Sequence, residues 1–218
     1  MSRCSRSLPT LALLAVVVVV VAASPAFAGP PLLCHPFDIG SARSLPWDGT
    51  RGWSHASASY DISKLVADTE AILTPSTPVI VRMETLRRAA IYAVHEERVM
   101  KELFVRLMHR AQAAERVGQA DGLAFLDAAY LIGALHQLAR VDETRSRAEV
   151  ISAVVGSADA YALVKKALSV RDGDAATQFA AALIAADGNR AAFAEHARKA
   201  REGAAKDALL ARNIGAIS

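Results

Sequence analysis

The chain has 218 residues, of which 53% are hydrophobic and 22% are charged. Its 25 Lys and Arg residues outnumber its 22 Asp and Glu residues, but two of the basic residues, Arg3 and Arg6, lie in a predicted signal peptide. Without them 23 basic residues face 22 acidic ones, and this balance gives no reason to expect nucleic acid or an anionic membrane as a partner. About 190 residues follow position 28, enough for one domain with a proper core.

The first 28 residues have the order of features that marks an export signal. Two arginines precede an unbroken apolar stretch at residues 11–23, and the small-residue site Ala26-Phe27-Ala28 follows. This pattern predicts a signal peptide at residues 1–28 that is cleaved after Ala28. The mature chain then begins at Gly29, and the protein is expected to be exported, either to the periplasm or out of the cell.

Two other interpretations of the N-terminus keep the chain on a membrane. A retained membrane helix needs roughly 20 apolar residues, and the stretch at 11–23 has only 13. A lipid anchor on Cys34 needs a small residue just before the cysteine, where this chain has Leu33. We therefore expect no stable membrane anchor after cleavage.

Residues 29–59 differ in composition from the rest of the chain, because they hold four prolines, repeated glycine and both tryptophans. Proline lacks the N–H that a helix needs and biases the preceding residue away from helical angles. The segment is therefore predicted to be an extended arm before a helical domain at 60–218. Its apolar side chains are expected to pin it into a groove of that domain: Leu32, Leu33, Phe37, Ile39, Leu45 and Trp47.

From residue 61 onward, apolar residues recur every three to four positions, and Pro, Gly and Asp-Gly turns punctuate the pattern. No stretch shows sustained alternation with period two, so the sequence predicts an all-α fold of packed helical hairpins. The stretch at 123–141 is apolar on most sides and is expected to be the most buried helix, whereas 79–95 shows one apolar stripe. The predicted helices span residues 61–73, 79–95, 96–117, 123–141, 147–155, 158–170, 175–186 and 190–204.

The second half of the chain shows a weak internal similarity. Residues 158–167 match residues 191–200 at an offset of 33, with small residues such as Gly133, Ala160, Ala167 and Ala200 placed where helices can approach closely. This offset resembles the period of tetratricopeptide repeats, which stack helix pairs. The resemblance implies a short repeat array from about Leu123 to Ala204, and an irregular helical bundle is the alternative. The stretch 33–47 is similar to the opening of uncharacterised exported bacterial proteins, which implies no activity.

The arm also contains the sequence's most unusual group of reactive side chains. Cys34, His35 and Asp38 place a thiol, an imidazole and a carboxylate within five residues, and such groups can bind a metal or form a reactive thiolate. Cys4 lies in the predicted signal peptide, so Cys34 has no partner for an intramolecular disulfide. However, adjacent side chains of an extended segment point to opposite faces, and a packed structural arm is the competing interpretation.

A second candidate site is a groove lined by four arginines, Arg82, Arg87, Arg88 and Arg98. Glu84 lies at helical spacing from two of them, which predicts weak ion pairs at the helix surface. The competing interpretation is a solvated, charge-rich helix face without a binding role.

Among six scattered histidines, His136 is the best candidate for a ligand-binding or proton-carrying group, because it interrupts an apolar helix. A core histidine with satisfied hydrogen bonds is the alternative. His95, His109 and His196 have charged neighbours and are expected on solvated helix faces.

No catalytic or cofactor-binding motif occurs, so the sequence gives no reason to expect an enzyme or a bound cofactor. It favours an exported binding or scaffolding module whose partner is another protein or an envelope component. The alternative is a thiol- or metal-dependent site at Cys34, His35 and Asp38.

Overall fold

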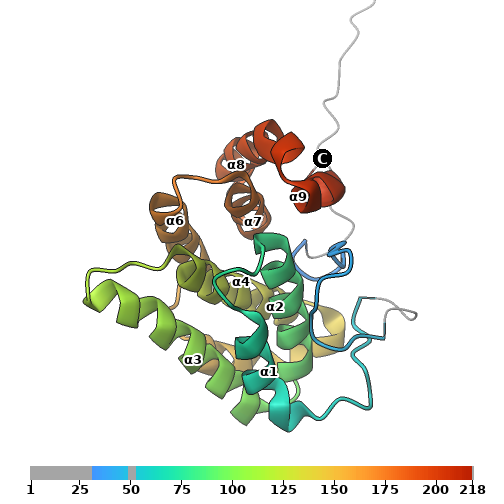
Figure 1. Ribbon diagram of the computed structural model, residues 1–218. Coiled ribbons are helices and arrows are strands. Elements are labelled where there is room, and N and C mark those ends of the chain that lie inside the picture. The colour runs from blue at the N-terminus through green and yellow to red at the C-terminus, as the bar shows by residue number, and fades with distance from the viewer. Residues whose placement is uncertain (1–30, 49–52, 218) are drawn as a thin grey trace, which may run out of the picture.

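The computed structural model describes residues 31–48 and 53–217. The predicted signal peptide and its cleavage site lie outside these ranges, as do residues 29, 30 and 49–52 of the predicted arm. The described chain forms nine α-helices (Figure 1): α1 (Leu65–Ile72), α2 (Val79–Ala93), α3 (Glu97–Arg116), α4 (Gly122–Leu138), α5 (Ala148–Val155), α6 (Ala160–Val170), α7 (Ala175–Ala185), α8 (Arg190–Gly203) and α9 (Ala208–Asn213).

The prediction of an all-α fold is confirmed within the described ranges, which contain no strand and one isolated antiparallel bridge between Trp47 and Ala56. The predicted helix boundaries agree with α1 to α8 within a few residues. Between α4 and α5, where no helix was predicted over most of the segment, the chain forms the short 3-10 helix Asp142–Arg147. Sequence reasoning missed α9 and the 3-10 helix Ile214–Ile217 after it.

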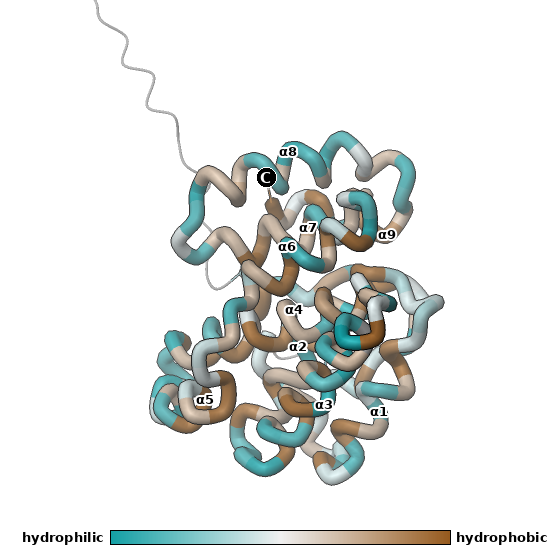
Figure 2. The backbone as a smooth tube through the Cα atoms, turned by 90° about the vertical axis from the view of Figure 1, so that its left-hand side faces the viewer, coloured by the Kyte–Doolittle hydropathy of each residue, from teal (hydrophilic) through white to brown (hydrophobic). Residues whose placement is uncertain are grey.

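Helices α2 and α4 lie in the middle of the molecule. Helices α6 and α7 pack against them on one side, with α8 outside α7, and α1 and α3 pack on the other side, an arrangement visible in Figures 1 and 2. The apolar positions of α4 face these neighbours, and all but two of its residues are buried. Every residue of α2 except Arg88 is buried as well. The residues of the predicted apolar stripe are thus buried, and so is most of the charged face, because the arm covers Glu84 and Arg87 while Arg82 pairs with Asp127 of α4.

Acidic and amide side chains mark where several helices begin. Asp121, Asp159 and Asp207 each accept hydrogen bonds from two backbone N–H groups at the first turn of α4, α6 and α9. Such caps satisfy N–H groups that have no partner within the helix. Gly156, at the end of α5, has the positive φ of 59° expected from its place in a turn.

One glycine of α4 allows the close packing expected from its size. A Cβ atom on Gly133 would lie 2.8 Å from Cδ1 of Leu32 and 3.9 Å from Cβ of Ala160. Gly133 therefore lets Leu32 of the arm approach the backbone of α4, whereas Ala160 of α6 would be in ordinary contact with a Cβ at this position. The tetratricopeptide resemblance itself stays a prediction.

Within the described part of the chain, no single helix is long and apolar enough to cross a membrane. The bent pair of segments Gly122–Leu138 and Asp142–Val155, which meet at 105°, satisfies the length and composition criteria together.

Candidate functional site

The described part of the arm lies against the helical body. Leu32, Leu33, Phe37 and Leu45 are at most 5% exposed, whereas Trp47 is only partly buried. The arm backbone is held by side chains of the body: the N–H of Leu32 donates to Gln137 Oε1 at 2.8 Å, and the hydroxyl of Tyr130 donates to the carbonyl of Leu32 at 3.1 Å. These contacts fix the position of the residues expected to form a reactive group.

The structure does not bring Cys34, His35 and Asp38 into one cluster. His35 is exposed, and Asp38 accepts a hydrogen bond from the N–H of Gly40 at 2.8 Å. In residues 31–48 and 53–217, no three His, Cys, Asp or Glu side chains are grouped as a metal site requires. Neighbouring residues of a non-helical segment point in different directions, which explains the separation.

The environment of Cys34 keeps its thiol protonated. The thiol is half-buried, and this burial raises its pKa, with a further contribution from the charge of Glu143 and a smaller opposing one from Arg87. A reactive thiolate needs the opposite shift. The geometry therefore favours a structural role for this part of the arm.

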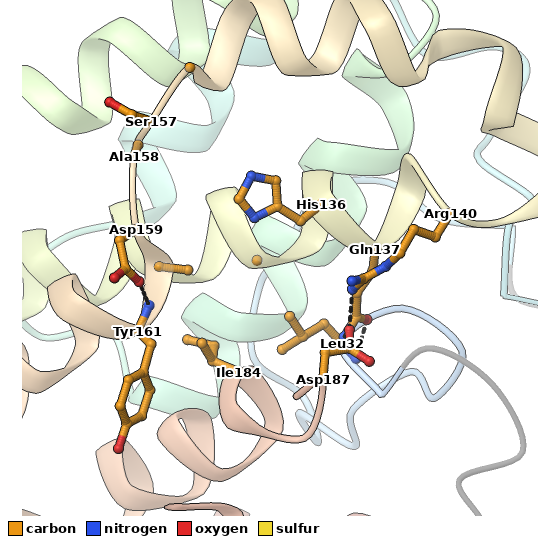
Figure 3. Close-up of a pocket in the computed structure, with 13 residues that line it drawn as sticks. Leu32, His136, Gln137, Arg140, Ser157, Ala158, Asp159, Tyr161, Ile184 and Asp187 are labelled. Carbon is orange, nitrogen blue, oxygen red and sulfur yellow. Dashed lines mark hydrogen bonds and ion pairs between the residues drawn. The ribbon is translucent and has the colours of Figure 1, made fainter. Parts of the chain in front are cut away.

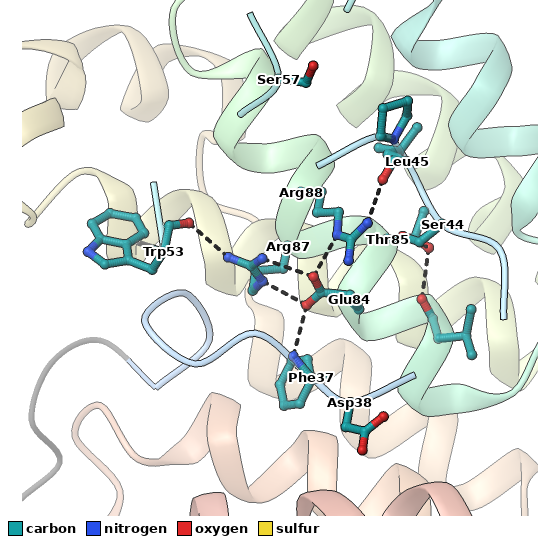
Figure 4. Close-up of polar contacts among 12 residues, drawn as sticks. Phe37, Asp38, Ser44, Leu45, Trp53, Ser57, Glu84, Thr85, Arg87 and Arg88 are labelled. Carbon is teal, nitrogen blue, oxygen red and sulfur yellow. Dashed lines mark hydrogen bonds and ion pairs between the residues drawn. The ribbon is translucent and has the colours of Figure 1, made fainter. Parts of the chain in front are cut away.

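Figure 4 shows Glu84, Arg87 and Arg88 of α2 between the parts of the arm at Phe37, Leu45 and Trp53. Both carboxylate oxygens of Glu84 accept hydrogen bonds from Arg87, at 2.8 and 2.9 Å, and Arg88 donates to the same carboxylate at 2.6 Å. Arg87 also donates to the carbonyls of Leu33, at 3.1 Å, and Trp53, at 3.0 Å. The predicted pairing of Glu84 with Arg87 and Arg88 is present, but its predicted position at the surface is wrong, since the side chains of Glu84 and Arg87 are fully buried.

The other two arginines of the predicted groove lie elsewhere. Arg82 is buried and donates to both carboxylate oxygens of Asp127, at 2.8 and 2.7 Å. The Arg98 side chain is 81% exposed and lies 3.9 Å from the carboxylate of Glu102. Two of the four guanidinium groups are thus enclosed by the protein and saturated with internal partners, so the four side chains do not share an open groove.

A cavity of about 410 Å³ opens beside α4, where the sequence singled out one histidine. Figure 3 shows the imidazole of His136 in the middle of this cavity, with the α5–α6 loop on one side and the end of α7 on another. Its size lies in the range of small-molecule sites. The lining residues are Leu32, Gly133, His136, Gln137, Arg140, Gly156, Ser157, Ala158, Asp159, Ala160, Tyr161, Ile184 and Asp187.

Most charged groups of this cavity are already paired. Arg140 forms an ion pair with Asp187, which also accepts a hydrogen bond from Nε2 of Gln137 at 2.9 Å. Asp159 uses Oδ1 to cap α6, accepting from the N–H of Tyr161 at 2.8 Å and of Ala162 at 3.0 Å. Its second oxygen receives no hydrogen bond from the described residues.

His136 is different, because its ring makes no hydrogen bond within the described part of the chain. Burial lowers its pKa, the charge of Arg140 lowers it further, and Asp159 opposes both. The imidazole is therefore neutral at neutral pH and offers one donor and one acceptor. The interpretation as a satisfied core histidine is wrong, because His136 is exposed to the cavity.

His196 has the surroundings that were expected for His136. It is 7% exposed, and its Nε2 lies 3.0 Å from the hydroxyl of Tyr161 while its Nδ1 lies 2.6 Å from Oε1 of Gln178. The expectation of a solvated His196 is wrong, since α8 turns this residue towards α6 and α7. His95 and His109 are exposed, as expected.

Sequence reasoning found His136 but missed the residues that form a cavity with it. Asp159 and Asp187 each stand at a helix boundary next to glycine or alanine, a pattern that indicates caps and turns rather than a site. No protein-family model, curated protein or solved structure matches this chain. The geometry of the cavity is therefore the basis for a proposal of its function.

Proposed function

We propose that this protein is an exported binding module that holds a small envelope component in the cavity around His136. The single observation that supports the proposal is a cavity of about 410 Å³ with an unpartnered imidazole in its middle. The cavity is open to solvent, and His136 and Asp159 are both exposed in it. A concave site of this size that presents a few polar groups is the usual form of a small-molecule binding site. No arrangement of catalytic groups accompanies the imidazole, so binding is the function that the geometry supports best.

The second feature in favour of binding is the way the cavity is built. Its base is one face of α4, the most connected helix of the core, and Leu32 of the pinned arm closes one side. Sites on rigid elements hold their polar groups in place before a ligand arrives, which lowers the cost of binding. The partner proposed here is thus a small molecule, and a protein partner is the competing outcome.

Native mass spectrometry of the protein purified from its own host tests this function. The expected result is a bound small molecule, and Ala158→Trp should abolish it by filling the cavity. Ala153→Trp is the matched control, because Ala153 is exposed on α5 and does not line the cavity. A bound molecule retained equally in both variants, or a protein captured in place of any small molecule, would contradict the proposal.

Export is the second part of the proposal, and it is supported by the order of basic, apolar and small residues at 1–28. N-terminal sequencing of the exported protein should give Gly29 as the first residue. An intact Met1, or a lipid on Cys34, would contradict it.

A further inference from the structure

The charged groups that line the cavity around His136 do not cancel, and a net negative charge remains. Arg140 and Asp187 cancel each other as an ion pair. The remaining full charge is the carboxylate of Asp159, and His136 is neutral because its pKa is lowered chiefly by burial. At neutral pH the lining side chains therefore sum to one negative charge.

The ends of the helices around the cavity add to this potential. Helices α4, α5 and α7 all end beside it, since Arg140, Gly156 and Asp187 lie just past their last residues. A helix carries roughly half a negative charge at its C-terminal end and half a positive charge at its N-terminal end. Only α6 begins here, and Asp159 already caps its first N–H groups.

The Asp159 carboxylate and the His136 imidazole can both accept hydrogen bonds in the cavity, and the neutral imidazole can also donate one. The second carboxylate oxygen of Asp159 receives none, and the neutral imidazole of His136 has one nitrogen that accepts. Figure 3 shows the Asp159 carboxylate at the α5–α6 loop and the His136 imidazole in the middle of the cavity, with Ile184 and Leu32 lower in the view providing apolar surface. A ligand that donates hydrogen bonds at one end and is apolar at the other fits this arrangement.

We propose that the cavity binds a small organic amine in its cationic form, with the ammonium group between the Asp159 carboxylate and the His136 imidazole. The apolar part of the amine packs against Ile184 and Leu32. This inference rests on the proposed function, because it assigns a ligand class to the same cavity.

NMR titration of the full mature chain with three probes of one shape tests the ligand class. Phenethylamine is a cation at neutral pH, 3-phenylpropanoate is an anion and 2-phenylethanol is neutral. We expect the amine to perturb the resonances of His136 and to bind at least about tenfold more tightly than the anion, a factor that one well-placed ionic contact supplies.

Asp159→Asn is the decisive variant, because asparagine caps a helix as well as aspartate does but has no charge. It should abolish the preference for the amine. Asp207→Asn is the matched control, since Asp207 caps α9 in the same way and does not line the cavity. This control should keep the preference unchanged.

The possible results distinguish a failure of the amine proposal from a failure of the proposed binding function. If all three probes bind equally, or the anion binds best, and Ala158→Trp removes that binding, the cationic ligand is excluded while the binding function stands. If no probe binds, the amine proposal is also overturned, and native mass spectrometry decides the binding function independently. A preference that survives Asp159→Asn would equally overturn the proposal.

Discussion

Two regions of this protein hold ionisable side chains close together, and they use them in opposite ways. Where the arm meets α2, Arg87 donates four hydrogen bonds, to Glu84 and to two arm carbonyls, and its side chain is fully buried, so a ligand cannot reach it. In the cavity, His136 and one oxygen of Asp159 have no partner within the described residues. A ligand site in this protein is therefore indicated by accessible polar groups without a hydrogen-bond partner in the protein, rather than by a high density of charge.

The largest loss of stability is expected when the network of Glu84, Arg87 and Arg88 is broken. Arg87→Met removes the bidentate partner of Glu84 and leaves a buried carboxylate with Arg88 and the N–H of Phe37 as its remaining partners. Breaking a buried ion pair costs about 3–5 kcal/mol, so urea denaturation should show a loss of this size in the free energy of unfolding. Arg98→Met is the control, because Arg98 is exposed and should change stability by less than about 0.5 kcal/mol. A loss below about 1 kcal/mol for Arg87→Met would contradict the role of this network.

The arm should show the second largest effect, at its deepest apolar residue. Leu33 is 0% exposed, and Leu33→Ala should cost about 2–5 kcal/mol through lost burial and a cavity. Cys34→Ser at the next position should cost less, about 1 kcal/mol, because its thiol is only half-buried. Thermal melts of both variants make the comparison. A Cys34→Ser variant that melts lower than Leu33→Ala would show that the thiol, not the apolar packing, holds the arm.

Stability should also differ between variants of His196 and His136, by a smaller amount. His196→Ala leaves Gln178 and the hydroxyl of Tyr161 without their partner, which costs about 1–3 kcal/mol for buried groups. His136→Ala removes no hydrogen bond within the protein and should change stability by about 0.5 kcal/mol or less, while it abolishes ligand binding in the cavity. Denaturation and native mass spectrometry measure the two quantities separately. Equal losses of stability would show that His136 is a structural residue after all.

Much of the fold follows from signals that lie close together in the sequence. Turn residues such as Gly156 and Asp172-Gly173-Asp174 predicted the ends of the helices to within a few residues. Helix α9 had the same kind of signal in Asp207 followed by Ala208-Leu209-Leu210, and it was missed because the segment is short. Local patterns thus locate long helices well, but they are less reliable for short helices.

The errors arose where a distant segment changes the surroundings of a residue. Periodicity placed Glu84 and Arg87 on a solvated face, because it does not show that residues 31–48 cover that face. Charged neighbours suggested a solvated His196, because the packing of α8 against α7 is not visible in the sequence. The cavity needed the ends of three helices and one loop together, and only His136 stood out in advance, as a polar residue in an apolar helix.

The smallest expected effect is a shift in the pKa of His136, which tests whether Asp159 acts on this residue electrostatically. Burial and Arg140 lower the pKa of His136, whereas the carboxylate of Asp159 raises it. Asp159→Asn removes the only opposing charge and keeps the helix cap, so the pKa of His136 should move further down. Its titration, followed by NMR on the imidazole resonances, should therefore have a midpoint at lower pH than in the unmodified protein. Asp207→Asn makes the same change of net charge away from the cavity and should leave the midpoint in place. If both variants shift the midpoint alike, the effect reports overall charge, and Asp159 and His136 do not act on the same ligand.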